Sequence, residues 1–486
     1  MKKKFLINLI LLVILNLLVK PFWVFGIDRT VQNLVGSAEY GMLFALFNIS
    51  VIFNILLDLG ITNFNNRHIS QRPEAFSSVF PRIIGIKLAL AFIYALVVLS
   101  AGLIIGYEKR QMLLMLLLIT NQFVVSFTLY LRSNISGLQY YTTDSILSVS
   151  DRIIMITACI VAYYAHFKGT TITIEWFVLI QTFSYVLSAF IVLSVLLSKT
   201  GLKKIKFGTA INWDIVKAGL PYALLIFLMS MYSRIDSIML ERLLPDGKEQ
   251  AGIYAQSFRI LDSVVMMPIL FAGLLLPMFS KLLGSKENVA PLLNLAFKLS
   301  WVIAVAFSLA AGYYSRPIID MLYNHGSMYS ARVFTILTFS FIPVSVVYIY
   351  STLITASGSL KWLNIVSLIS VCINIALNIV LIPHYKAIGA AIACLITQTI
   401  AAIAQILLVK NQFQTVFASF KKFAFFTLMA LVLAHILYIV VSDWIFGFLA
   451  IGLAIAFLGF ITKMIPFKNI TRLLIPADFK KEGNCS

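Results

Sequence analysis

Lysine and arginine side chains inside otherwise apolar stretches are the residues of this sequence best suited to binding chemistry. A charged side chain at the centre of a membrane helix costs roughly 2.5–3.5 kcal/mol on insertion scales, so each should face protein or water. Arginine can hold a phosphate or carboxylate through two parallel hydrogen bonds, and lysine supplies a compact positive charge. These cations predict a cavity that binds an anion at several depths. The candidates are Lys20, Lys87, Arg152, Arg234, Arg259 and Lys298.

Structural roles compete with anion binding at some of these positions. Lys298 and Arg152 fall near predicted helix ends, where a long side chain can extend its charge to the membrane interface. No acid lies within one helical turn of Lys20 or Lys87, so nothing close in the sequence neutralises them. Substrate binding is therefore the favoured role of these two lysines.

Three acids and one proline are candidates for coupling or gating: Asp58, Asp236, Asp262 and Pro221. Capping or loop pairing is the alternative role for the first two acids. Asp262 follows Arg259 by three residues on the same helical face, so a structural pair competes with anion binding there. Proline removes a backbone hydrogen bond and permits a kink, although membrane helices also tolerate it without moving.

The composition places these residues in a membrane protein. Of 486 residues, 60% are hydrophobic and 12% are charged, against roughly 45–50% and 25% in an ordinary soluble domain. Apolar runs recur along the chain, each long enough to cross a hydrocarbon core of about 30 Å as a helix. The net charge of +19 does not indicate nucleic acid, because the lysines and arginines are scattered in short loops between apolar runs.

The apolar runs predict about 14 transmembrane helices. An even number places both termini on one side of the membrane. Most of the 38 lysines and arginines lie on that side, so the positive-inside rule makes both termini cytoplasmic. The predicted spans centre on residues 5–25, 39–59, 80–103, 112–131, 146–164, 176–197, 216–240, 253–276, 291–313, 333–354, 365–382, 388–409, 423–441 and 445–465.

Two short motifs recur at nearly one offset and indicate a duplicated six-helix unit. Glu39-Tyr40-Gly41-Met42 corresponds to Gln250-Ala251-Gly252-Ile253-Tyr254, and Ser136-Gly137-Leu138 to Ser357-Gly358-Ser359. Parallel repeats of this kind suit alternating access around a central cavity. The prediction is two six-helix lobes at residues 1–197 and 216–410, a basic cytoplasmic linker at 198–215, and two further helices with a cytoplasmic tail at 411–486.

Several motifs, in order along nearly the whole chain, resemble the polysaccharide-exporter branch of the MOP superfamily, the Wzx-type flippases of lipid-linked oligosaccharides. The matching segments are Gly36-Ser37-Ala38-Glu39-Tyr40-Gly41, Leu57-Asp58-Leu59-Gly60-Ile61, Gly219-Leu220-Pro221, Arg234-Ile235-Asp236, Gly252-Ile253-Tyr254, Asn374-Ile375-Ala376-Leu377-Asn378, Leu381-Ile382-Pro383 and Gly389-Ala390-Ala391. The resemblance implies an all-α, MOP/MATE-like integral membrane fold.

The resemblance also implies a function. A Wzx-type flippase moves an undecaprenyl-diphosphate-linked oligosaccharide, such as a polysaccharide or O-antigen repeat unit, from the cytoplasmic to the periplasmic leaflet of the bacterial inner membrane. Its partners would be the lipid-linked glycan, membrane lipid, and polysaccharide polymerase with other assembly proteins. No cofactor and no nucleic acid are expected.

Two alternatives remain open at this point. A cation-coupled multidrug antiporter of the same superfamily generally needs a membrane-embedded acid, whereas the predicted first helix has Lys20 and no acid between Phe5 and Phe25. A membrane oligosaccharide polymerase or glycosyltransferase usually has a large outer loop, and the longest one predicted here is short. The sequence has no phosphate-binding loop motif and no histidines at metal-ligand spacing, so neither an enzyme nor a metal site is expected.

Overall fold

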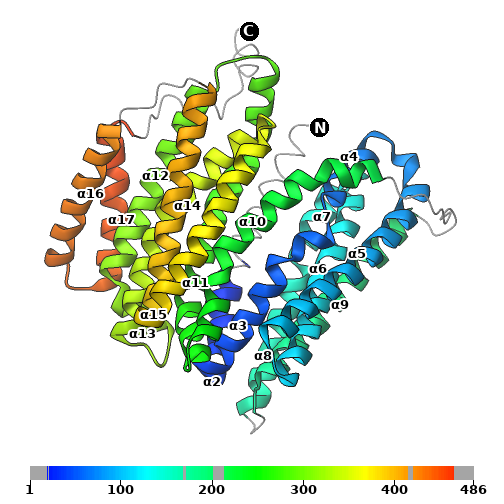
Figure 1. Cartoon of the computed structure of the whole chain (residues 1–486), viewed down its shortest axis with the longest axis horizontal. Helices are drawn as coiled ribbons and strands as arrows, with labels where there is room; N and C mark the ends of the chain where they lie inside the picture. Colours follow the sequence, from blue (N-terminus) through cyan, green and yellow to red (C-terminus); the bar gives the residue numbers. More distant parts are fainter. Residues whose placement is uncertain (1–18, 20, 168–170, 201–212, 414–419, 465–486) are drawn as a thin grey trace, which may run out of the picture. The chain divides into compact units, whose positions relative to one another are not determined.

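The computed structural model describes residues 19, 21–167, 171–200, 213–413 and 420–464, and every regular element within these ranges is a helix (Figure 1). The elements of the first half are η1 Trp23–Asp28, α2 Arg29–Val35, α3 Ser37–Ile52, η2 Asn54–Leu57, α4 Ile61–Gln71, η3 Pro73–Ala75, α5 Phe76–Ile105, α6 Lys109–Gly137, α7 Tyr141–Leu147, α8 Ser150–Phe167 and α9 Ile174–Thr200. Those of the second half are α10 Trp213–Leu243, α11 Gly247–Gly284, α12 Ala290–Tyr313, α13 Ser315–Leu322, α14 Met328–Ala356, α15 Leu360–Phe413, α16 Phe420–Val440 and α17 Trp444–Ile461.

Eleven helices in the described ranges are long and apolar enough to cross a membrane, or twelve if the bent pair Ser37–Ile52 and Asn54–Gln71 forms one span. Helix α15 contains two predicted spans, because Lys386 has a non-helical backbone (φ 54°, ψ −129°) between them. The first predicted helix lies almost wholly outside the described residues. The all-helical membrane fold is confirmed, and the count of fourteen stays a prediction.

The chain divides into two compact units that interleave along the sequence. The first unit comprises Met1–Ser263, Leu322–His325 and Ser367–Ala393, and the second comprises Val264–Met321, Gly326–Val366 and Cys394–Ser486. These boundaries differ from the four segments suggested by the sequence, which remain a prediction. The predicted linker lies mostly outside the described residues.

In the first unit, α6 packs against α3, α4, α5 and α9, and α3 also packs against α10. Apolar side chains from these helices form a buried cluster around Ile69, Phe80, Tyr130 and Val192. The hydroxyl of Tyr130 donates to the carbonyl of Phe80 at 3.0 Å, so the ring is buried without leaving its polar atom unpaired.

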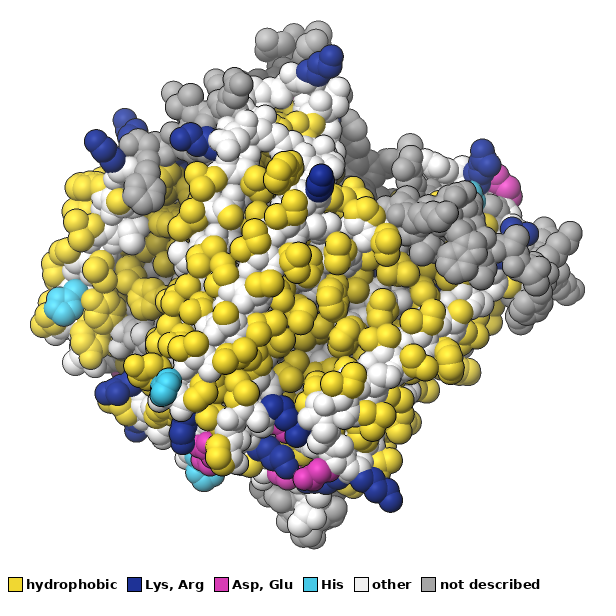
Figure 2. All heavy atoms as spheres, in the orientation of Figure 1, with side chains coloured by type: hydrophobic (Ala, Val, Ile, Leu, Met, Phe, Trp, Pro, Cys, Tyr) yellow, Lys and Arg dark blue, Asp and Glu magenta, His cyan; other side chains and the backbone are white. Residues whose placement is uncertain are grey.

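In the second unit, α12 packs against α14, α16 and α17. The ring of Phe297 contacts those of Tyr350 and Phe423, with centroids 5.6 and 4.7 Å apart. On the face drawn in Figure 2, hydrophobic side chains cover the middle of the helices, and most charged side chains gather near their ends. That distribution suits helices whose middle sections face lipid and whose ends reach the headgroups.

The backbones of α3 and α11 meet where they cross, in the first unit. A Cβ atom added to Gly41 would lie 2.0 Å from the carbonyl oxygen of Lys248, and one added to Gly252 would lie 1.9 Å from that of Ser37. Only glycine fits at such a distance, as at the close helix crossings of other membrane proteins. The two glycines are the corresponding residues of the repeated motifs.

We predict that Gly252→Ala lowers the midpoint temperature of thermal unfolding of the detergent-solubilised protein. The added methyl group forces the two helices apart, and overpacking of this kind typically costs about 1–3 kcal/mol. Gly273→Ala, in the same helix, is the matched control because an added Cβ there has no atom within 4 Å. Equal midpoints for Gly252→Ala and the wild type would contradict the close crossing.

Candidate functional site

Arg259 of α11 lies at the centre of a polar cluster beside this helix crossing. Its Nε donates to the hydroxyl of Tyr40 at 3.0 Å and lies 3.2 Å from Oδ2 of Asp28. The Tyr40 hydroxyl in turn donates to the same carboxylate oxygen at 2.6 Å. The Asp28 side chain is only 4% exposed and that of Arg259 is 19% exposed. The guanidinium is therefore neutralised by a buried acid while part of it remains open.

Arg234 of α10 makes the second half of this cluster. Its Nη1 donates to Oδ1 of Asn48 at 3.0 Å, and its Nη2 lies 3.5 Å from the carboxylate of Asp262. Asn48 also donates to Ser237 at 2.7 Å. The side chains of Arg234 and Asp262 are 20% and 34% exposed. Asp262 thus pairs with Arg234, and the alternative of an Arg259–Asp262 pair gives way to Arg259–Asp28.

Aromatic rings hold both guanidinium groups. The Cζ of Arg259 lies 5.2 and 5.1 Å from the ring centroids of Phe44 and Phe47, and that of Arg234 lies 5.8 Å from the ring of Phe258. Cation–π contacts contribute about 0.5–2 kcal/mol each and do not depend on a particular anion. The arginines can therefore exchange an acid partner for another anion and keep their positions.

Asp236, also on α10, is fully buried beside the cluster and is surrounded by neutral donors. It accepts hydrogen bonds from the Tyr254 hydroxyl at 2.8 Å, from Nδ2 of Asn374 at 3.0 Å and from Nδ2 of Asn378 at 2.7 Å. Both carboxamides come from α15. Hydrogen bonds to a carboxylate are roughly twice as strong as those between neutral groups, so they help offset the cost of burying this charge.

Two tyrosine–aspartate pairs therefore flank the crossing of α3 and α11. Tyr40 with Asp28 and Tyr254 with Asp236 each join a residue of a repeated glycine motif to an acid of a preceding helix. The sequence analysis did not assign a role to either tyrosine. The signal was present in the motifs, since each repeat places one tyrosine within two residues of its glycine.

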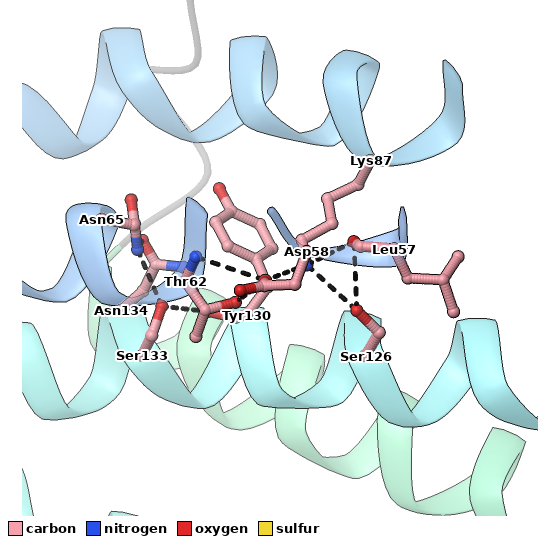
Figure 3. Close-up of polar contacts among 9 residues, drawn as sticks. All are labelled: Leu57, Asp58, Thr62, Asn65, Lys87, Ser126, Tyr130, Ser133 and Asn134. Atoms are coloured by element: carbon pink, nitrogen blue, oxygen red, sulfur yellow. Dashed lines mark hydrogen bonds and ion pairs between the residues drawn. The ribbon is translucent and has the colours of Figure 1, made fainter. Parts of the chain in front are cut away.

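Lys87 and Asp58 meet at a break in the second predicted helix, between α3 and α4 (Figure 3). Leu59 and Gly60 both have positive φ there, 45° and 82°, which ends one helix and starts another. The ammonium of Lys87 lies 2.5 Å from Oδ1 of Asp58 and donates to the carbonyl of Leu57 at 2.9 Å. Lysine thereby satisfies a carbonyl at the break and binds the acid next to it.

Further hydrogen bonds close this group of residues. Ser126 of α6 accepts from Lys87 at 3.0 Å, and Thr62 donates to Asp58 through both its backbone N–H and its hydroxyl. The Lys87 side chain is 1% exposed and that of Asp58 is 29% exposed. The rule of one helical turn missed Asp58 because this acid approaches from another helix. These contacts favour a role for Lys87 in fixing the break.

The other candidate residues lie apart from the cluster. Arg152 of α8 is placed 3.6 Å from Asp151 and over the ring of Trp23. Lys298 is half-buried in α12 of the second unit, and no described acid lies within ion-pair distance of it. Pro221 is inside α10, which is assigned without interruption across it. Lys20 lies outside the described residues.

The cluster suits binding of an oxyanion more than metal chemistry. Two partly exposed guanidinium groups, Arg234 and Arg259, present N–H donors in the fork geometry that matches phosphate oxygens. Within the described residues, no group of three or more histidine, cysteine, aspartate or glutamate side chains is arranged to hold a metal ion. Of the candidates, the structure brings together Arg234, Arg259 and Asp262, with Asp236 adjacent.

Solved structures with the same fold include transporters. The chain matches the lipid II flippase MurJ in an inward closed conformation with a TM-score of 0.68, at 17% identity, over 96% of this chain and 99% of that chain. It matches a multidrug resistance MATE family transporter of the MOP superfamily, inward-facing, with a TM-score of 0.57, at 15% identity, over 83% of this chain and 94% of that chain.

A third match is a MOP superfamily transporter from Pyrococcus furiosus, with a TM-score of 0.59 and 14% identity, over 84% of this chain and 93% of that chain. A sequence search among curated proteins finds no match. The family model described as MatE matches residues 221–380. A second model, described as polysaccharide biosynthesis protein, matches residues 5–283, more than half of the chain. The chain therefore belongs to the polysaccharide biosynthesis protein family and has the fold of the MOP superfamily of membrane transporters.

Proposed function

We propose that this protein flips an undecaprenyl-diphosphate-linked oligosaccharide across the bacterial inner membrane by alternating access. The observation that carries the proposal is the pair of partly exposed arginines, Arg234 and Arg259, held by aromatic rings beside a helix crossing. A diphosphate bears several oxyanions, and two guanidinium groups can bind them at once. Family membership supports a glycan substrate, and the shared fold supports transport.

Binding would proceed by exchange of partners at the cluster. Phosphate oxygens replace the weaker acid contact of Arg234, the 3.5 Å pair with Asp262, before the shorter contacts of Arg259. A hydrogen bond to a charged group contributes about 1.5–3 kcal/mol, enough to compete with a long and partly exposed ion pair. The lipid tail stays in the bilayer throughout.

Contacts between the first and second halves of the chain, all within the first unit, supply the gate. Gln32 donates to the carbonyl of Gly252 at 3.0 Å, and Gln111 donates to the carboxylate of Glu241 at 2.9 Å. These residues lie at helix ends that the positive-inside rule assigns to the periplasmic side. Closure at those ends supports a conformation that receives substrate from the cytoplasm, with both termini cytoplasmic.

Two further groups would serve coupling and gating. Asp236 is buried among neutral donors, so a change in its charge or contacts would alter the packing of α10 against α15. Lys87 and Asp58 fix the break that lets α3 and α4 point in different directions. Lys298 and Lys20 remain proposed contacts of the substrate at other depths. A polysaccharide polymerase and other assembly proteins are the proposed partners.

Replacing either cluster arginine by alanine should slow flipping of a fluorescent undecaprenyl-diphosphate-linked glycan in proteoliposomes by about tenfold or more, because each loses a charge-assisted contact with the diphosphate. The variants are Arg234→Ala and Arg259→Ala. Arg316→Ala is the control, since Arg316 forms only a surface pair with Asp320, with both side chains at least 40% exposed.

Unchanged flipping by both cluster variants, with folded protein, would sink the arginine mechanism. Transport of a cationic dye without transport of the glycan lipid would instead favour the multidrug antiporter. Measuring both substrates on the same proteoliposomes separates these outcomes.

Asp58→Asn should lower the unfolding midpoint more than Lys87→Met does. The first change leaves a buried ammonium without its carboxylate, a loss that costs about 3–5 kcal/mol at buried pairs. The second leaves an acid that is partly exposed and still bonded to Thr62. The double variant should melt above Asp58→Asn alone.

The same proteins test what Lys87 does. A positioning role predicts that Lys87→Met keeps measurable flipping and loses stability. If this variant melts like the wild type and no longer flips the glycan lipid, Lys87 binds the substrate directly and the structural role is wrong.

A further inference from the structure

A cavity of about 180 Å³ lies within the first unit between α6, the α7–α8 junction and α9. It is distinct from the arginine cluster, whose residues do not line it. Its volume far exceeds that needed for one ordered water molecule. The polar residues that line it include Thr128, Arg132, Ser148, Asp151, Arg152 and Tyr185.

The charges that line the cavity are balanced. Arg132 pairs with Asp144 at 2.8 Å, with both side chains less than a fifth exposed, and Arg152 lies 3.6 Å from Asp151. The second distance is too long for a hydrogen bond, so it leaves donors on Arg152 and acceptors on Asp151 for a ligand. A balanced pair of charges does not select an anion. It does suit a ligand that both donates and accepts hydrogen bonds.

Hydroxyl and aromatic groups complete the lining. The Thr128 hydroxyl donates to the carbonyl of Val124 at 2.8 Å and that of Ser148 to the carbonyl of Ser145 at 2.7 Å, which leaves the oxygen of each free to accept. The ring of Tyr185 lies 5.9 Å from the Arg152 guanidinium and adds an apolar face. Such a mixture of fixed polar groups and an apolar face is typical of small-molecule sites.

A buried polar residue with no partner continues this face of α6. Asn121 is 3% exposed, and neither its Oδ1 nor its Nδ2 has a hydrogen-bond partner among the described residues. The spacing from Asn121 to Val125, Thr128 and Arg132 is that of one helical face, and the last three line the cavity. An unpaired buried carboxamide costs about 1–3 kcal/mol, which a ligand or water can offset.

We propose that this cavity binds one sugar ring of the lipid-linked glycan, an inference that rests on the proposed function. Sugar hydroxyls both donate and accept, as the paired charges and serine and threonine oxygens require, and a ring face can pack on Tyr185. The cavity lies between the end of α6 and the start of α8, near the predicted cytoplasmic ends of these helices. It therefore selects the glycan on the side where loading occurs, while the arginine cluster binds the diphosphate.

The test compares two lipids bound to the full-length protein in nanodiscs by native mass spectrometry. One is the lipid-linked glycan extracted from the source organism, and the other is undecaprenyl diphosphate without sugar. Thr128→Leu, which fills the cavity, and Arg152→Gln should each weaken binding of the glycan lipid by about tenfold. Binding of the sugar-free lipid should not change. Thr120→Leu is the matched control, because Thr120 makes the same type of backbone bond on an exposed face of α6.

Equal weakening of both lipids would overturn the sugar site in favour of a phosphate or anionic headgroup site. Unchanged binding of the glycan lipid to both folded variants would also overturn it, while wild-type flipping of that lipid would leave the proposed function intact. Failure of the wild type to bind or flip the glycan lipid overturns both proposals. Melting temperatures show which variants are folded, and Ser148→Ala replaces either one that is not.

Discussion

The backbone contact between α3 and α11 is the constraint on which the candidate site depends. Because Gly41 and Gly252 have no side chains, the two helices approach closely enough for Arg259 on one to reach Tyr40 on the other. The Tyr40 hydroxyl then brings in Asp28 from the end of η1. A helix separation larger by the width of a methyl group would break this chain of contacts at its first link. The repeated glycines are thus part of the binding chemistry although they carry no functional group.

The break between α3 and α4 solves a different physical problem. A chain that turns inside the membrane exposes carbonyl groups that water cannot reach, and each needs a partner from the protein. Lys87 supplies that partner to Leu57 and is itself neutralised by Asp58 (Figure 3). The bend is therefore held by a charge pair whose removal would affect direction and stability together. An all-apolar sequence could not make this turn at equal cost.

Sequence alone predicted the helices well and the pairings poorly. Each apolar run that falls in the described ranges is a helix, because length and hydropathy are properties of the run itself. The partners of Arg259 and Lys87 come from other helices, 231 and 29 positions away. Such contacts depend on how far each helix is rotated and where it crosses its neighbour, and spacing rules within one helix do not contain that information. Asn374 and Asn378 appeared only as part of a resemblance, since their meaning depends on Asp236 lying opposite.

The pairing of Arg234 with Asp262 and of Arg259 with Asp28 has an electrical consequence. In the empty protein these four groups sum to no net charge, so the membrane potential acts only weakly on their movement. A bound diphosphate adds negative charge, and each unit charge moved across 100 mV is worth about 2.3 kcal/mol. An interior-negative potential would then favour outward movement of the loaded carrier and leave the return of the empty one nearly unaffected. Under the proposed function, the resting potential itself would give the cycle its direction.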